Sequence, residues 1–201
     1  VIGEGELDEA PMLYIGEKLG TGKGFAVDIA VDPLEGTNFA ANNLPGALSV
    51  IAVAEKNSLL NVPETSMEKI AFSNIEADAV DLDYPVKKNI SNLADAKNKD
   101  ISDITACILN RPRHKEIIEK LTKLKVKLKL ISDGDVIAGL QVALPNSGVD
   151  VLLGIGGTTE GVLTAAALRC IGGEIICRAW PKNDEEKQLA AQNGIDLDIV
   201  Y

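Results

Sequence analysis

Hydrophobic and polar residues alternate with a period of two in several short stretches of the first half of the chain. AVDIAVD (26–32) alternates throughout, which predicts a strand with one apolar face. ALSVIAVAE (47–55) and SLLNV (58–62) lie on either side of Lys56-Asn57, and this arrangement predicts a β-hairpin. Strands joined in this way indicate an antiparallel sheet in the first half.

A helical pattern precedes these strands. Asp8 is suited to cap a helix over residues 9–19, with Pro11 in its first turn and Gly20 after its end. The apolar stripe of this expected helix consists of Met12, Leu13, Gly16 and Leu19.

Strand and helix patterns alternate in the second half of the chain. The expected strands are residues 104–109, 125–131, 149–155 and 174–180, and the expected helices are 114–124, one after Asp135, and 159–171. This alternation predicts a parallel or mostly parallel sheet with helices on its faces, and ligands of such sheets bind beyond the carboxyl ends of the strands. The lysines of KVKLKLI (125–131) alternate outward, which is typical of a strand near a sheet edge.

Residues 76–103 are polar and weakly patterned, and KKNISNLADAKNKD (87–100) is the best candidate for a linker or surface excursion. The fold class is therefore predicted as α/β: an α+β first half with an antiparallel sheet, over residues 1–100, and an alternating β/α second half, over 101–201. We expect the first part to bind metal and the second to bind substrate.

Composition limits the classes of function. With 46% hydrophobic and 25% charged residues, the 201-residue chain has the composition of a soluble globular protein. Its formal net charge of −10 does not attract nucleic acid or an anionic membrane. The three cysteines, Cys107, Cys170 and Cys177, lack a CxxC spacing, so a reducing, cytoplasmic location fits better than a disulfide framework or a zinc site.

The single His114 excludes a metal site built from several histidines. No apolar run approaches the roughly 20 residues that a membrane span needs, and no signal peptide is visible. The chain starts without Met inside an expected strand and stops in another alternating stretch, IDLDIVY (195–201), so we expect it to be part of a longer protein.

Carboxylates, arginines and glycines collect in loops that follow the expected strands. These loops are GEGELDEAP (3–11), VDPLEGTN (31–38), RPRH (111–114), SDGD (132–135) and GIGGTTEG (154–161). Carboxylates on several strand ends can converge on Mg²⁺ or Mn²⁺, which prefer oxygen ligands. Arginine forks and free N–H groups at helix N-termini suit phosphate. Together these loops suggest metal-dependent chemistry on a phosphorylated small molecule.

Each of these features also has a more ordinary interpretation. Asp8, Glu9 and Glu160 could interact with helix dipoles. Arg111 and Arg113 taken alone would usually be surface residues, and a glycine-rich turn without the P-loop lysine is weak evidence.

VDPLEGTN is similar to the D-P-[IL]-[DE]-G-T signature of the lithium-sensitive, metal-dependent phosphatase superfamily, which includes inositol monophosphatases and fructose-1,6-bisphosphatases. Residues 2–22, 110–114, 133–135 and 154–173 resemble one branch of it, the bacterial class II fructose-1,6-bisphosphatases. The resemblance runs in order through nearly the whole chain to about residue 173. It implies a sugar phosphatase fold of layered sheets and helices.

The resemblance also implies roles for individual residues. The implied metal ligands, for Mn²⁺ or Mg²⁺, are Glu4, Asp32, Glu35 and Glu160. Glu4, Asp8 and Thr37 would take part in catalysis, with Asp8 assisting the metal site and Thr37 orienting the attacking water. The implied substrate contacts are Glu35, Gly36, Thr37, Ser66, Arg111, Pro112, Arg113, Asp133, Gly134, Asp135 and Gly157. Of these, the arginines would bind phosphate and Asp133 and Asp135 would hold sugar hydroxyls.

Two departures from the family pattern bear on specificity and activity. Ser66, in PETSMEK (63–69), stands where the family usually has a tyrosine that reaches the substrate. The family also draws a further acidic metal ligand from a segment that would precede Val1.

The resemblance implies a metal-dependent hydrolase that converts fructose 1,6-bisphosphate to fructose 6-phosphate and phosphate in gluconeogenesis or another part of carbohydrate metabolism. Sedoheptulose 1,7-bisphosphate, alone or in addition, is the nearest alternative substrate, and an inositol phosphate is disfavoured by GEGELDEAP. A non-catalytic phosphosugar-binding protein is the alternative from another class. The expected partner is a small sugar bisphosphate and not nucleic acid or a membrane, and a homo-oligomer is left open.

Overall fold

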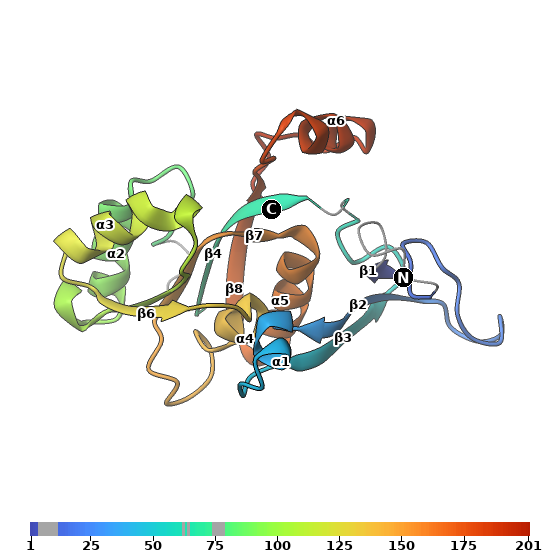
Figure 1. Cartoon of the computed structure of the whole chain (residues 1–201), viewed down its shortest axis with the longest axis horizontal. Helices are drawn as coiled ribbons and strands as arrows, with labels where there is room; N and C mark the ends of the chain where they lie inside the picture. The colour runs from blue at the N-terminus through green and yellow to red at the C-terminus, as the bar shows by residue number, and fades with distance from the viewer. Residues whose placement is uncertain (4–11, 62, 64, 74–78) are drawn as a thin grey trace.

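A computed structural model of the chain describes residues 1–3, 12–61, 63, 65–73 and 79–201 (Figure 1). The strands are β1 (Ile2–Gly3), β2 (Val27–Glu35), β3 (Leu48–Glu55), β4 (Ser66–Ser73), β5 (Thr105–Leu109), β6 (Lys127–Ile131), β7 (Val151–Gly157) and β8 (Gly173–Ala179). The α-helices are α1 (Thr37–Ala41), α2 (Val86–Ala96), α3 (Lys115–Lys123), α4 (Asp135–Leu140), α5 (Thr158–Ile171) and α6 (Asp184–Gln192). Short 3₁₀ helices span Ile101–Asp103 and Pro112–His114.

Within the described residues these strands form two sheets. One has the order β1-β2-β3, with β1 parallel and β3 antiparallel to β2. The other has the order β6-β5-β7-β4-β8, in which β6, β5 and β7 are parallel and β4 runs antiparallel to both of its neighbours. The mixed α/β class is confirmed, and β6 is an edge strand as its lysines predicted.

The elements stack in layers. Helices α2 and α3 lie on one side of the five-stranded sheet (Figure 1), where Phe72, Ile90, Ile104 and Leu121 belong to one buried hydrophobic cluster. Helices α4 and α5 pack on its other side, and α5 also contacts β2 and β3 of the small sheet. A second cluster therefore runs from Ala30 on β2 through Leu163 on α5. Burying these apolar side chains supplies the main favourable term in folding.

Most of the predicted elements are confirmed, with small shifts in their ends. The confirmed strands are those at 26–32, 47–55, 104–109, 125–131, 149–155 and 174–180, and the confirmed helices are those at 114–124, after Asp135 and at 159–171. The prediction of a mostly parallel second sheet is wrong in one respect, because β4 from the first half of the chain lies between β7 and β8. The division of the chain at residue 100 stays a prediction.

The predicted helix over 9–19 is wrong for the part that the structure describes, since residues 12–19 contain no helix. Leu13 has a φ of 63°, and Met12 and Leu19 are more than half exposed. A short helix is marginal unless its apolar stripe packs against something. Asp8 and Pro11 lie outside the described residues.

The predicted hairpin is also wrong. Strand β3 pairs with β2, whereas residues 58–61 form no strand and residue 62 lies outside the described part. Leu59 and Leu60 pack against the second cluster instead of alternating along a ladder.

The predicted linker at 87–100 is wrong because most of it is helix α2. The polar composition of this segment hid Ile90, Leu93 and Ala94, which are 1–2% exposed and recur at helical spacing on one face. No helix within the described ranges is long and apolar enough to cross a membrane.

Candidate active site

Four of the five loops singled out by the sequence meet where α1, α4 and the start of α5 come together. The Asp133 carboxylate accepts hydrogen bonds from the backbone and the side chain of Asn38, at 2.9 and 3.1 Å. The Val136 N–H donates to Glu35 at 2.8 Å, and Arg111 lies 3.9 Å from Asp133. The loop at 154–161 joins through Lys69, which contacts both Asp135 and the Gly157 carbonyl.

A bulge directs the two acidic residues of VDPLEGTN. Asp32 pairs with Val50 and Glu35 with Leu48, so three steps along β2 correspond to two along β3. Residues three apart in a regular strand point to opposite faces, and one extra residue returns them to the same face. The Leu34 N–H donates to the Asp32 carboxylate at 3.0 Å and stabilises the turn.

Two glycine turns pack around one aromatic ring. Gly36 and Gly134 have φ values of 81° and 79°, and each caps the helix that follows it. A Cβ at either position would lie within 2.9 Å of the Phe39 ring. The left-handed backbone and the close ring both require glycine, so Phe39 sets the spacing between the turns. Thr37, the first residue of α1, is exposed beside them.

A buried ion pair lies at the centre of the site. Lys69 Nζ is 2.6 Å from Asp135 Oδ2, and both side chains are less than 10% exposed. Glycines in β7 make this possible, because a Cβ at Gly156 would lie 2.3 Å from Asp135 and one at Gly157 would overlap Glu160. The strand thus brings its backbone close to three charged side chains.

The carboxylates disfavour one another's ionisation. Burial and the neighbouring Asp135 raise the pKa of Glu35 to about 7. Burial also raises the pKa of Asp32, with Asp135 and Asp133 adding to the effect. For Glu160 the rise in pKa comes first from burial and then from Asp135, while Lys69 opposes it. Such a cluster favours a cation, which would offset both the burial and the repulsion.

The donor set fits a hard divalent ion such as Mg²⁺ or Mn²⁺, since every candidate ligand is a carboxylate oxygen. In the part of the chain that the structure describes, no three acidic, histidine or cysteine side chains are grouped tightly enough to hold an ion by themselves. Glu4 and Asp8, the ligand and assisting residue expected from the first loop, lie outside the described residues.

The arginine loop is fixed to β7. Arg113 donates from Nε and Nη2 to the Ile155 carbonyl, at 3.0 and 2.8 Å. Arg111 precedes a 3₁₀ turn that begins at Pro112 and ends at His114. His114, which the sequence placed only at a helix start, is fully buried.

Ser66 begins β4 directly across from Gly157, so the structure places it at the edge of the site. It is only 1% exposed, and within the described residues its hydroxyl has no hydrogen-bond partner. The loop before it is tied to the start of α5, because the Thr158 hydroxyl accepts from the Thr65 N–H at 3.1 Å and donates to the Pro63 carbonyl at 2.7 Å.

The sequence analysis missed Lys69 and Asn38. Lys69 lies two residues from Met67 and from Ala71 in β4, so all three side chains share one face of the strand, and all three are buried. This spacing of two from apolar residues would have indicated that the lysine faces inward. Asn38 ends the quoted VDPLEGTN motif, but only the folded chain brings it to Asp133.

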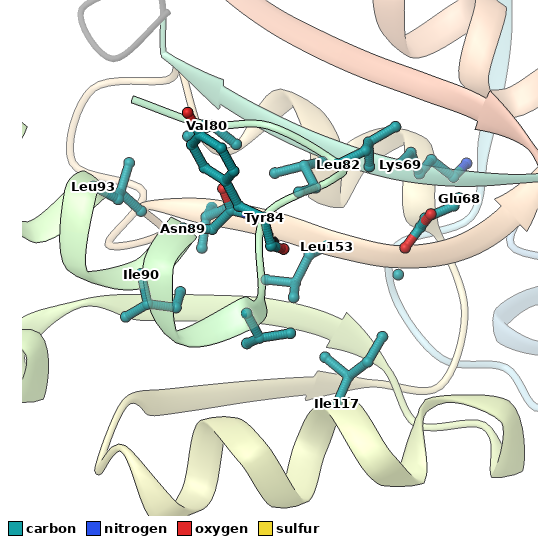
Figure 2. A pocket seen from close by; sticks show the side chains of 14 residues that line it. Glu68, Lys69, Val80, Leu82, Tyr84, Asn89, Ile90, Leu93, Ile117 and Leu153 are labelled. Atoms are coloured by element: carbon teal, nitrogen blue, oxygen red, sulfur yellow. Dashed lines mark hydrogen bonds between the residues drawn. The ribbon is translucent and has the colours of Figure 1, made fainter. Parts of the chain in front are cut away.

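The cavity drawn in Figure 2, of about 50 Å³, does not lie at the acidic cluster. Its lining consists mostly of core side chains from α2, β4, β7 and the segment before α2, among them Leu82, Ile90 and Leu153. Glu68 points to the cavity side of β4, whereas the Lys69 amine lies on the other side of the strand (Figure 2). The cavity is thus part of the packing beneath the site.

The sequence of the chain matches a known family over its whole length. The family model described as bacterial fructose-1,6-bisphosphatase, glpX-encoded, matches residues 1–201. The chain belongs to this bacterial fructose-1,6-bisphosphatase family. The resemblance stated from the motifs is confirmed, and fructose bisphosphatases are in general metal-dependent.

Curated members of the family are closely similar. Fructose-1,6-bisphosphatase 1 class 2 of Escherichia coli (strain K12) is 48% identical over 184 residues, which are 92% of this chain and 55% of that protein. The class 2 enzymes of Escherichia coli O6:H1 (strain CFT073) and Shigella flexneri match with the same identity and the same coverage. The chain thus spans about half the length of the curated relatives it matches.

Proposed function

We propose that this member of the fructose-1,6-bisphosphatase family hydrolyses the 1-phosphate of fructose 1,6-bisphosphate to give fructose 6-phosphate and inorganic phosphate. The single observation that carries this proposal is the convergence of the loops bearing Asp32 and Glu35, Arg111, Asp133 and Glu160 on one place in the fold. The names of the family and of the similar class 2 enzymes support the substrate.

Asp32, Glu35 and Glu160, with Glu4, are the residues that would hold divalent ions, for which we propose Mn²⁺ or Mg²⁺. When bound, such ions lower the pKa of a coordinated water and stabilise the leaving oxygen. The raised pKa values of Glu35 and Glu160 support this assignment, because a bound cation would restore their ionised form.

The remaining residues would bind and orient the substrate. The exposed Thr37 hydroxyl would orient the attacking water, and Gly36 would let the backbone approach the phosphate. Arg113 uses two of the five guanidinium N–H groups on Ile155, so three remain for phosphate oxygens. Asp133 and Asp135 would accept hydrogen bonds from sugar hydroxyls, and Gly157 would lie against the sugar. We place the reaction in the cytoplasm, in carbohydrate metabolism.

The test is phosphate release, with Mn²⁺ or Mg²⁺, by the protein that carries this sequence. The substrates are fructose 1,6-bisphosphate, sedoheptulose 1,7-bisphosphate and inositol 1-phosphate. We expect metal-dependent release from the fructose ester and a loss of about 100-fold or more in Asp32→Asn. Asp28→Asn, which alters an aspartate on the same strand, is the matched control and should keep the activity.

Each other outcome has a distinct meaning. A preference for the seven-carbon sugar would assign the protein to sedoheptulose bisphosphate and would favour Ser66 as the residue that sets specificity. A folded protein that binds sugar phosphate but releases phosphate from none of the esters would be a phosphosugar-binding protein, and the hydrolase proposal would be wrong.

A further inference from the structure

The only histidine of the chain bridges two parallel strands where their direct pairing stops. Strands β5 and β7 pair at Ala106–Val151 and Cys107–Leu152. Further along, His114 Nδ1 lies 2.7 Å from the Leu109 carbonyl on β5, and Nε2 lies 2.8 Å from the Ile155 N–H on β7. The imidazole thus takes the place of a ladder hydrogen bond and holds the strand ends a ring's width apart.

The fold provides a slot for this ring. A Cβ at Gly154 would lie 2.9 Å from His114 Nε2, closer than real Cβ atoms come to a rigid group. Gly154 also has a φ of 146°, a conformation that residues with side chains rarely adopt. The backbone conformation and the space beside it therefore both require glycine at position 154, and the missing side chain leaves room for the imidazole of His114.

The two hydrogen bonds fix the tautomer. The Ile155 N–H can only donate, so Nε2 has to be unprotonated, and the Leu109 carbonyl can only accept, so Nδ1 carries the hydrogen. Protonation would turn Nε2 into a donor facing another donor. Burial lowers the pKa of His114, and the positive charges of Arg113 and Arg111 act in the same direction. The Lys69–Asp135 ion pair and His114 line one small cavity, where the ion pair adds no net charge.

The residue next to His114 is tied to the same peptide. Arg113 donates twice to the Ile155 carbonyl while His114 accepts from the Ile155 N–H. Both polar groups of Ile155 are therefore held by consecutive residues of the RPRH loop. A shift of the ring would move the carbonyl on which the guanidinium rests.

We propose that His114 is a positioning residue, which as the neutral Nδ1–H tautomer spaces β5 from β7 and so aims Arg113 at the phosphate of the substrate. The phosphate in this statement rests on the proposed function, whereas the tautomer and the strand spacing do not.

The imidazole nitrogens of His114 can be observed by ¹⁵N NMR, and they are identified as the signals that disappear in the His114→Gln variant. We expect the neutral Nδ1–H form throughout pH 5.5–8 in the folded protein. The Nε2–H tautomer, or titration near the ordinary histidine pKa of about 6.5, would overturn the proposal.

The second measurement is the affinity for fructose 1,6-bisphosphate by calorimetry, which needs no turnover, together with KM and kcat. For His114→Gln and for Arg113→Lys we expect Kd and KM to rise about tenfold, with kcat changed less than about threefold. Ile108→Val, a neighbouring core change on β5, is the control that disturbs packing without touching the bridge.

His114→Gln that loses thermal stability while keeping the wild-type Kd would show that the ring is merely structural, and the positioning role would be wrong. The two proposals fail separately. A protein that binds the bisphosphate without releasing phosphate would refute the hydrolase, yet the tautomer and the Kd of the variants would still decide the role of His114.

Discussion

The two sheets of this protein differ in how many of their faces are covered by helices. We expect this difference to divide the residues that mainly stabilise the fold from those that mainly serve the reaction. The five-stranded sheet has helices on both faces, and its residues Phe72, Cys107 and Ile108 are 0–1% exposed. The three-stranded sheet packs one face against α5, while Ile51 and Val53 on the other face of β3 are 65% and 60% exposed.

The residues of the candidate active site come from both sides of this boundary. Asp32 and Glu35 end β2 of the small sheet, whereas Lys69 and Gly157 belong to the large one. The site therefore depends on the well-packed sheet for its fixed framework and on the small sheet for acidic side chains. We expect changes in the large sheet to affect mainly stability and changes at the end of β2 to affect mainly function.

The largest effect should come from Lys69→Met, which removes the cation that pairs β4 with Asp135 of α4. Breaking a buried ion pair leaves Asp135 charged and uncompensated, and we expect the free energy of unfolding to fall by about 3–5 kcal/mol. Denaturation by urea measures the free energy of unfolding of the wild type and of the variant. The double variant Lys69→Met/Asp135→Asn should recover part of the loss, and no recovery would mean that the pair is not coupled.

Ile108→Ala tests the large sheet itself. Its side chain is fully buried on β5, so we expect a loss of about 2–5 kcal/mol from lost transfer energy and a residual cavity. The same urea experiment applies, and a loss below 1 kcal/mol would show that the sheet relaxes around the cavity.

Glu35→Gln tests the acidic end of the small sheet. The pKa of Glu35 is about 7 when folded, against an ordinary 4.5, so the folded state binds more protons between these values. Stability should therefore fall as pH rises through this window and stay lower above it. Without divalent ions, we expect Glu35→Gln to be more stable than the wild type by on the order of 1–3 kcal/mol at pH 8, and equal to it near pH 4.

Thermal unfolding between pH 4 and 8, in buffer with a chelator, measures this difference. Glu55→Gln, an exposed glutamate on the neighbouring strand β3, is the control. Added Mn²⁺ should reverse the order, because only the wild type keeps the carboxylate that we propose as a ligand. A wild type that gains stability from pH 5 to pH 8 without metal would contradict the raised pKa.

The smallest effect belongs to Ile51→Ala, the same chemical change as Ile108→Ala on the uncovered face of the small sheet. We expect a loss below about 1 kcal/mol, mainly from the lower strand preference of alanine. A loss as large as that of Ile108→Ala would mean that this face is covered in solution, and the contrast between the sheets would disappear.

Local pattern was enough for most of the elements and for the identity of the loops. The apolar run at 104–109, the alternation at 125–131 and the helical pattern at 159–171 predicted β5, β6 and α5, because each pattern reflects how its element is buried. The motif VDPLEGTN together with RPRH and GIGGTTEG indicated the family. The prediction of a linker at 87–100 failed because only a few residues of this polar segment are apolar. These few lie on one face of a helix, and the overall composition does not reveal them.

The tertiary structure decided what depends on distant partners. Whether 58–62 or β2 pairs with β3 is a choice between ladders, and the insertion of β4 beside β7 joins segments more than 80 residues apart. The bulge that puts Asp32 and Glu35 on one face, the Lys69–Asp135 pair and the His114 bridge likewise need the folded chain. The physical reason is that periodicity records how much of a residue is buried, whereas the neighbour that buries it is set by how the layers pack.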